Sequence, residues 1–121
     1  MAEIRVCGTN ELSDGKVRVI EMPSMEIGVI RHAGQYFAYQ NKCPHRGGPA
    51  CEGIRLPKVV DVIEADGTFT GQSFDESEMH IVCPWHGWEF RLSDGVCSAD
   101  RKWRLKKFEV VERAGDIFVV I

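Results

Sequence analysis

Two short loops of matching composition constrain this chain of 121 residues more than any other feature. Residues 43–49 read Cys-Pro-His-Arg-Gly-Gly-Pro, and residues 83–88 read Cys-Pro-Trp-His-Gly-Trp. The proline after each cysteine fixes φ and removes an N–H, which stiffens the backbone at that point. The glycines after each histidine permit positive φ and close approach of the backbone. Each loop therefore offers one thiolate and one imidazole from a stiff frame, which is a pattern typical of metal ligation.

The rest of the chain is predicted to form short β-strands separated by turns. Regularly spaced alternating runs with Gly- or Asp-containing turns are typical of an all-β sandwich or barrel. The Asp66-Gly67 pair between two such runs indicates a hairpin over about 59–74. A short helical stretch is expected around 10–14. The predicted strands cover residues 17–22, 27–30, 36–41, 59–64, 68–74, 79–83, 88–92, 108–113 and 117–121.

Length and charge favour a single small domain and disfavour nucleic-acid-binding and membrane-spanning proteins. A chain of this size can bury about two thirds of its surface, so residues 1–121 are expected to fold as a single domain without disulfides. The formal net charge of −3 lacks the basic excess of a nucleic-acid binder. No apolar run approaches the ~20 residues that span a bilayer. We therefore expect neither nucleic acid nor membrane among its partners.

The five cysteines favour metal chemistry over disulfides, because their number is odd. The N-terminus lacks the basic and apolar layout of a signal peptide. Together these features lead us to expect a cytoplasmic protein. Cys7, Cys51 and Cys97 are expected to be small structural thiols, with Cys51 the nearest to a Cys/His loop.

Two cysteines and two histidines could bind either of two metal centres. Structural zinc uses this set, but zinc modules usually pair Cys with Cys and His with His. Here each loop is mixed and a long stretch separates the two loops, which favours an iron–sulfur cluster. A zinc site and a site without metal both stay open at this point.

The two loops resemble those of the Rieske iron–sulfur proteins. The resemblance includes the residues around the histidines, Arg46-Gly47-Gly48-Pro49 in the first loop and Trp85, Gly87 and Trp88 in the second. The soluble bacterial Rieske-type ferredoxins are the most similar group. The resemblance implies a fold of stacked small antiparallel sheets with both cluster-binding loops at one end. It also implies one [2Fe-2S] cluster, with Cys43 and Cys83 on one iron and His45 and His86 on the other.

The sequence departs from this family in three places. The stretch between the loops is longer than in typical Rieske-type ferredoxins, and we interpret about 52–78 as an inserted hairpin with an acidic tail at 75–78. Gly48 and Trp85 stand where quinol-oxidising members carry a disulfide, and Trp88 stands in place of a serine that donates to the cluster. Both changes predict a low reduction potential. The stretch 97–105 lacks the proline that often covers the cluster.

Three functions are consistent with these features. The first is a one-electron carrier between an NAD(P)H-dependent reductase and the terminal oxygenase of a ring-hydroxylating or related system. The second is the small Rieske-type subunit of an oxidoreductase such as nitrite reductase, and the third is a structural zinc module. No Ser-His-Asp set, phosphate loop or dinucleotide fingerprint is visible, so we expect an electron-transfer component rather than a complete enzyme.

Some remaining polar residues have ordinary interpretations. His32 is expected in a turn and His80 at a strand edge, both as common polar residues. Trp88 and Phe90 are expected in the core. The basic run 101–107 is expected to be a solvated strand edge or a contact for an acidic partner.

Overall fold

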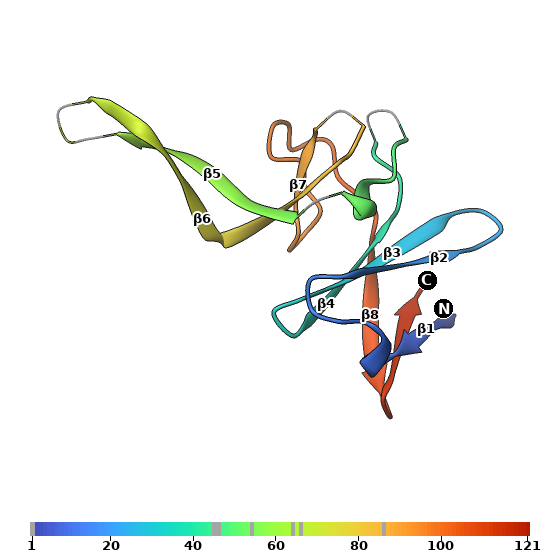
Figure 1. Ribbon diagram of the computed structural model, residues 1–121. Helices are drawn as coiled ribbons and strands as arrows, with labels where there is room; N and C mark the ends of the chain where they lie inside the picture. The colour runs from blue at the N-terminus through green and yellow to red at the C-terminus, as the bar shows by residue number, and fades with distance from the viewer. Residues whose placement is uncertain (1, 45–46, 54, 64, 66, 86) are drawn as a thin grey trace.

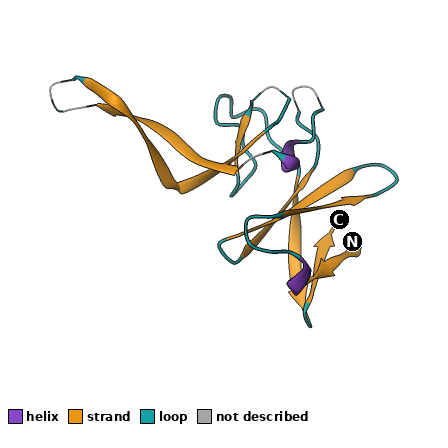
Figure 2. Ribbon diagram, viewed as in Figure 1, coloured by secondary structure: helices purple, strands orange, loops and turns teal. Residues whose placement is uncertain are grey.

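The computed structural model describes residues 2–44, 47–53, 55–63, 65, 67–85 and 87–121. Within these residues the chain forms nine β-strands and two single-turn 3-10 helices, η1 (Thr9–Glu11) and η2 (Ala50–Glu52). Figure 2 shows that strands and loops make up almost all of the molecule. The described part of the chain contains no helix that could cross a lipid bilayer. The all-β prediction is confirmed.

The larger sheet has six antiparallel strands. It joins the two ends of the chain to the central hairpins, because the first and last strands pair from Glu3↔Val120 to Gly8↔Asp116. A short contact, Ala38↔Phe108 and Tyr39↔Lys107, connects the terminal strands to the hairpins. In sheet order the strands are β1 (Glu3–Gly8), β9 (Asp116–Val120), β8 (Lys107–Arg113), β4 (Gln35–Gln40), β3 (Glu26–His32) and β2 (Val17–Glu21).

The smaller sheet has three antiparallel strands, β5 (Arg55–Ile63), β6 (Phe69–Val82) and β7 (Glu89–Arg91), with β6 in the middle. Strand β7 pairs with only the last three residues of β6. Beyond that pairing, β5 and β6 continue as a two-stranded arm that extends away from the rest of the molecule (Figure 1). The predicted hairpin is therefore confirmed, and it is longer than the sequence suggested.

The structure corrects the prediction of two separate strands at 68–74 and 79–83. They are one strand, β6, and the acidic residues 75–78 lie within it rather than in a tail. The register shifts from Pro57↔Met79 to Lys58↔Asp75, so the extra residues 76–78 of β6 are taken up in a bulge. The polar stretch that indicates a loop in isolation is thus a bulge within a strand that pairs with β5 on both sides of it.

Two further elements differ from expectation at the N-terminus. Strand β1 was not predicted, since its partner β9 lies at the opposite end of the chain. The expected helical stretch at 10–14 is a single 3-10 turn that begins earlier, at Thr9.

The hydrophobic core has two parts, one in each sheet region. One lies within the large sheet and includes Ile27, Val29, Ile117 and Val119, all fully buried. The other packs between the small sheet and the two Cys/His loops. Its members include the core residues Tyr39, Ile81, Phe90 and Leu105 together with the cysteines Cys43, Cys51, Cys83 and Cys97.

Candidate metal centre

The two Cys/His loops fold in the same way. In the first, Cys43 N–H donates to Gly48 O at 2.8 Å and Gly47 N–H donates to Cys43 O at 2.7 Å. In the second, Cys83 N–H donates to Trp88 O at 2.8 Å and Gly87 N–H donates to Cys83 O at 2.9 Å. In each loop, therefore, the cysteine backbone bonds to the residues four and five positions later. The similar composition of the loops is matched by the same pair of backbone hydrogen bonds at each cysteine.

Glycine is needed at the fourth position after each cysteine. Gly47 has φ +76 and Gly87 has φ +72, the left-handed conformation that other residues adopt only with strain. The histidine of each loop lies between its cysteine and this glycine. The predicted ligands His45 and His86 lie outside the described residues.

The tertiary structure brings the two loops into contact. A Cβ atom added to Gly48 in the first loop would lie 2.8 Å from Trp85 Cγ and 3.2 Å from Cys83 Sγ in the second. The side chains of Cys43 and Cys83 are both 1% exposed. Two shielded sulfurs on equivalent loops that meet at a glycine form a cradle that fits a multi-ligand metal centre, and a larger residue at Gly48 would fill it.

A buried amide holds the base of the first loop. Asn41 is 7% exposed and its side-chain oxygen accepts the Cys51 N–H at 2.9 Å. Its side-chain nitrogen donates to Glu52 at 2.9 Å and to Glu26 at 3.3 Å. This one residue ties β3 and η2 together two positions before Cys43. The strand β4 thus leads into the loop from a fixed point.

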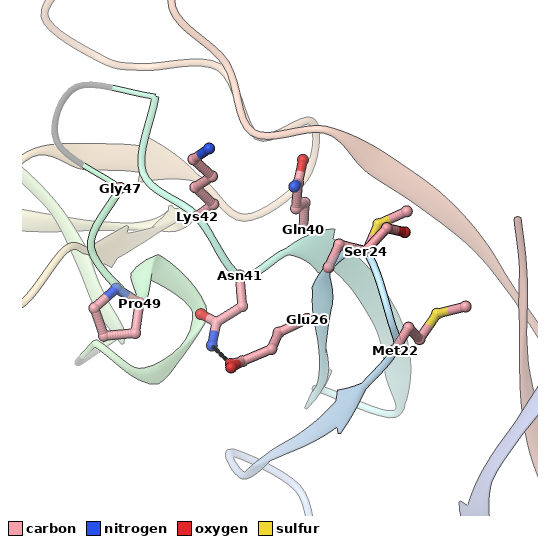
Figure 3. A pocket seen from close by; sticks show the side chains of 9 residues that line it. Met22, Ser24, Glu26, Gln40, Asn41, Lys42, Gly47 and Pro49 are labelled. Atoms are coloured by element: carbon pink, nitrogen blue, oxygen red, sulfur yellow. Dashed lines mark hydrogen bonds between the residues drawn. The ribbon is translucent and has the colours of Figure 1, made fainter.

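A groove of about 440 Å³ lies beside this anchor. Figure 3 shows the Asn41–Glu26 hydrogen bond on its wall, with Lys42 and Pro49 on one side and Met22 on the other. The turn between β2 and β3 forms the second wall. One flank of the first loop is therefore open to solvent.

A buried histidine, His80, holds the base of the second loop. The sequence predicted an ordinary polar residue at a strand edge. His80 does not lie at a strand edge: it is on the central strand β6 and is 3% exposed. Its Nε2 lies 2.7 Å from Glu78 Oε2 and its Nδ1 lies 3.0 Å from Glu89 Oε1. A carboxylate at hydrogen-bond distance from each ring nitrogen fixes the orientation of the imidazole. The Glu89 contact joins the strands on either side of the second loop.

Cys51 has a structural role in this core. It is fully buried, and its thiol lies 3.5 Å from the carbonyl oxygen of Tyr39, to which it donates. Burial raises the pKa of the Cys51 thiol to about 12. A thiol that stays protonated at neutral pH is a poor metal ligand. Cys7 and Cys97 are also buried, at 2% and 1% exposure.

Comparison with known proteins gives the family. The profile of the Rieske [2Fe-2S] domain matches residues 2–109. Apoptosis-inducing factor 3 of Homo sapiens is 27% identical over 77% of this chain, and the chain spans only 12% of that protein's length. The ferredoxin component of the alkene monooxygenase system of Xanthobacter autotrophicus is 25% identical over 96% of this chain and 79% of its own.

Solved structures show the same fold at lower identity. The ferredoxin of carbazole 1,9a-dioxygenase from Nocardioides aromaticivorans superposes with a TM-score of 0.71 and 19% identity, over 99% of this chain and 98% of its own. A putative NADH-dependent nitrite reductase small subunit from Mycobacterium tuberculosis gives 0.71 and 20%, over 98% and 93%. With the profile match, the cradle and the two equivalent loops, the chain belongs to the Rieske [2Fe-2S] domain family and its cofactor is one [2Fe-2S] cluster.

Proposed function

We propose that Cys43, Cys83, His45 and His86 hold the cluster and that this chain is a one-electron carrier. Cys43 and Cys83 would ligate one iron, and the two histidines the other. When bound, the cluster accepts and releases a single electron. Imidazole in place of thiolate removes negative charge from the centre, which raises its reduction potential above that of an all-cysteine cluster.

The observation that carries this proposal is the contact between two equivalent loops. Gly48 and Trp85 pack against each other directly beside Cys83 Sγ. These are the positions where the resemblance places a disulfide in quinol-oxidising members. A glycine–tryptophan contact takes the place of that covalent link here. We therefore expect a potential at the low end of the Rieske range.

A low potential suits electrons that come from a nicotinamide-linked reductase. We propose that the chain receives electrons from an NAD(P)H-dependent reductase and passes them to a terminal oxygenase. The alkene monooxygenase relative, named a ferredoxin component, supports this assignment, because it matches this chain over nearly its whole length. The cytoplasm is the compartment we propose, since Cys7, Cys51 and Cys97 are buried thiols without disulfide partners.

A second assignment is the small Rieske-type subunit of a larger oxidoreductase such as nitrite reductase. The structural neighbour from Mycobacterium tuberculosis carries that name and shares the fold. Stable co-purification with a large catalytic subunit would favour it over a free carrier. We also propose that residues 1–121 are one domain, with the β5–β6 arm, at about 52–78, as an insertion.

Metal analysis and a redox titration test the proposal. The protein purified without oxygen should contain about two irons per chain and give one reversible one-electron wave. His86→Cys should lower the potential or lose the cluster, whereas Cys51→Ser should keep both iron and potential. A His86→Cys protein with the wild-type potential and spectrum would show that the ligand assignment is wrong. Zinc in place of iron would refute the carrier function.

A further inference from the structure

A strongly basic segment follows β7. Five of the seven residues from Arg101 to Lys107 are lysine or arginine, and all five are exposed. Trp103 is partly buried and Leu105 is 1% exposed, so these two side chains anchor the segment to the core. The cations before, between and after these two anchors face solvent. The chain as a whole has a formal net charge of −3, so this segment is a local concentration of positive charge on an acidic protein.

The basic segment runs between the bases of the two metal-centre loops. Three residues before the segment, Ser98 N–H donates to the backbone oxygen of Glu89, directly after the second loop, at 2.9 Å. At the other end, Gln40 N–H donates to the oxygen of Lys106 at 2.8 Å, shortly before the first loop. In the middle, the ring of Trp103 lies 6.0 Å from that of Trp88. A molecule bound to this segment would therefore lie beside the metal centre.

Little of this positive charge is neutralised within the molecule. Among the described side chains, Lys102 is the only cation of the segment that forms an ion pair. Its Nζ lies 3.6 Å from the Asp100 carboxylate. Lys107 donates to the backbone oxygen of Ser93 at 2.9 Å, and its charge is one of those that lower the pKa of Asp94. Arg101 and Arg104 form no ion pair with a described carboxylate. The field of the segment is directed to solvent.

An apolar contact surface lies on the second loop itself. Trp85 is 59% exposed, the one large apolar side chain so exposed among the described residues. Its indole covers Gly48, so it sits above the junction of the two loops. Tryptophan and arginine are the residue types enriched at the energetic centre of protein interfaces.

The β5–β6 arm carries an excess of the opposite charge. Residues 59–78 contain six carboxylates and no lysine or arginine. The arm extends away from the loops (Figure 1). The basic segment and the arm therefore differ in the sign of their net charge. Such polarity orients an approaching charged partner before contact.

We propose that Trp85 and the Arg101–Lys107 segment form the docking surface for an acidic redox protein. The inference rests on the proposed electron-carrier function and names the charge of its partner. The cations accelerate encounter and turn the metal centre toward the partner, and Trp85 supplies the apolar contact that holds the complex. The acidic arm repels the same partner, so it disfavours docking at the far end.

Electrodes of opposite charge test the orientation directly. The holoprotein is adsorbed on gold that carries either carboxylate-terminated or ammonium-terminated monolayers. Voltammetry gives the electron-transfer rate constant, and a quartz microbalance gives the adsorbed mass. At an ionic strength of about 0.01 M we expect a rate at least about ten-fold higher on carboxylate than on ammonium, falling as salt screens the charges. The ammonium surface should bind the arm and hold the centre away from the electrode.

Two double variants of equal net charge locate the effect. Arg101→Glu with Arg104→Glu should reduce the carboxylate rate to about the ammonium value and weaken adsorption there. Arg5→Glu with Arg113→Glu makes the same charge change near the β8–β9 turn, at the end of the molecule opposite the loops (Figure 1), and should leave the carboxylate rate unchanged. Equal rates on both surfaces, or equal losses in both variants, would overturn the proposal.

Other outcomes separate the docking inference from the carrier function. No wave on either electrode, with adsorption that still depends on Arg101 and Arg104, would refute the carrier function and leave the basic docking surface in place. Dimerisation at low salt that Arg101→Glu with Arg104→Glu abolishes would assign the segment to a second copy of this chain. Binding to phosphatidylserine vesicles, lost in the same variant while the electrode rates are unchanged, would assign it to a lipid surface. Either result would overturn the redox-partner proposal.

Discussion

Gly53 offers the sharpest test of how the fold positions the second cysteine. It follows η2 and lies against the backbone that flanks Cys83. A Cβ atom there would overlap the carbonyl oxygen of Val82 and lie 2.7 Å from its carbonyl carbon and 3.2 Å from Pro84 Cδ. The backbone of Gly53 itself, at φ −72 and ψ 167, is open to any residue. Gly53→Ala is therefore a purely steric perturbation aimed at one metal ligand.

The geometry sets the size of the effect. Carbon atoms in contact lie about 3.5–4.0 Å apart, so the backbone at Val82 would have to move by at least about 1 Å, and its overlapping carbonyl oxygen by more. Overpacking that forces backbone shifts costs about 1–3 kcal/mol, and we expect about 3 kcal/mol here because a backbone segment cannot rotate away. At this chain length, that corresponds to a melting temperature lower by about 10 °C or more.

The assay measures stability and cluster content together. Gly53→Ala should melt at a lower temperature and retain well under two irons per chain, because Cys83 is displaced from its partner loop. Gly34→Ala is the matched control: Gly34 has φ +77 with no atom within 4 Å of its added Cβ. It should cost about 1 kcal/mol of backbone strain and keep its iron. A Gly53→Ala protein that keeps full iron and melts no lower than Gly34→Ala would refute the reasoning.

Three further substitutions probe the surrounding core. Because the pKa of Cys51 is raised, its contribution to the free energy of unfolding is complete below a pH of about 9 and is lost as the pH rises toward 12. Cys51→Ala should therefore flatten the decline of the free energy of unfolding between these pH values. An unchanged decline, measured by urea unfolding at each pH, would contradict the assignment. Tyr39→Phe removes the 2.5 Å hydrogen bond to Leu92 O and should cost about 1–2 kcal/mol in urea unfolding; no loss of stability would contradict it. Gly48→Ala should turn the exposed Trp85 indole outward, shift its fluorescence to the red and lower the free energy of unfolding by about 1 kcal/mol. An unshifted spectrum would show that the two loops do not meet there.

The sequence alone determined what is local. Turn residues such as Ala33-Gly34 and Ala114-Gly115 act on their immediate neighbours, so the hairpins that they close were predictable. The two Cys/His loops were recognisable for the same reason, because stiffness after the cysteine and positive φ after the histidine are properties of single residues. The ligand types and the iron–sulfur family followed from those loops.

The tertiary structure decided what depends on distant partners. Strand β1 exists because β9, from the other end of the chain, pairs with it. Strand β6 continues past its acidic bulge because β5 pairs with it on both sides of the bulge. His80 reads as an ordinary polar residue until β6 is placed between β5 and β7, where Glu78 and Glu89 bracket its ring. Pairing and burial are set by contacts between residues far apart in sequence, and no local pattern encodes them.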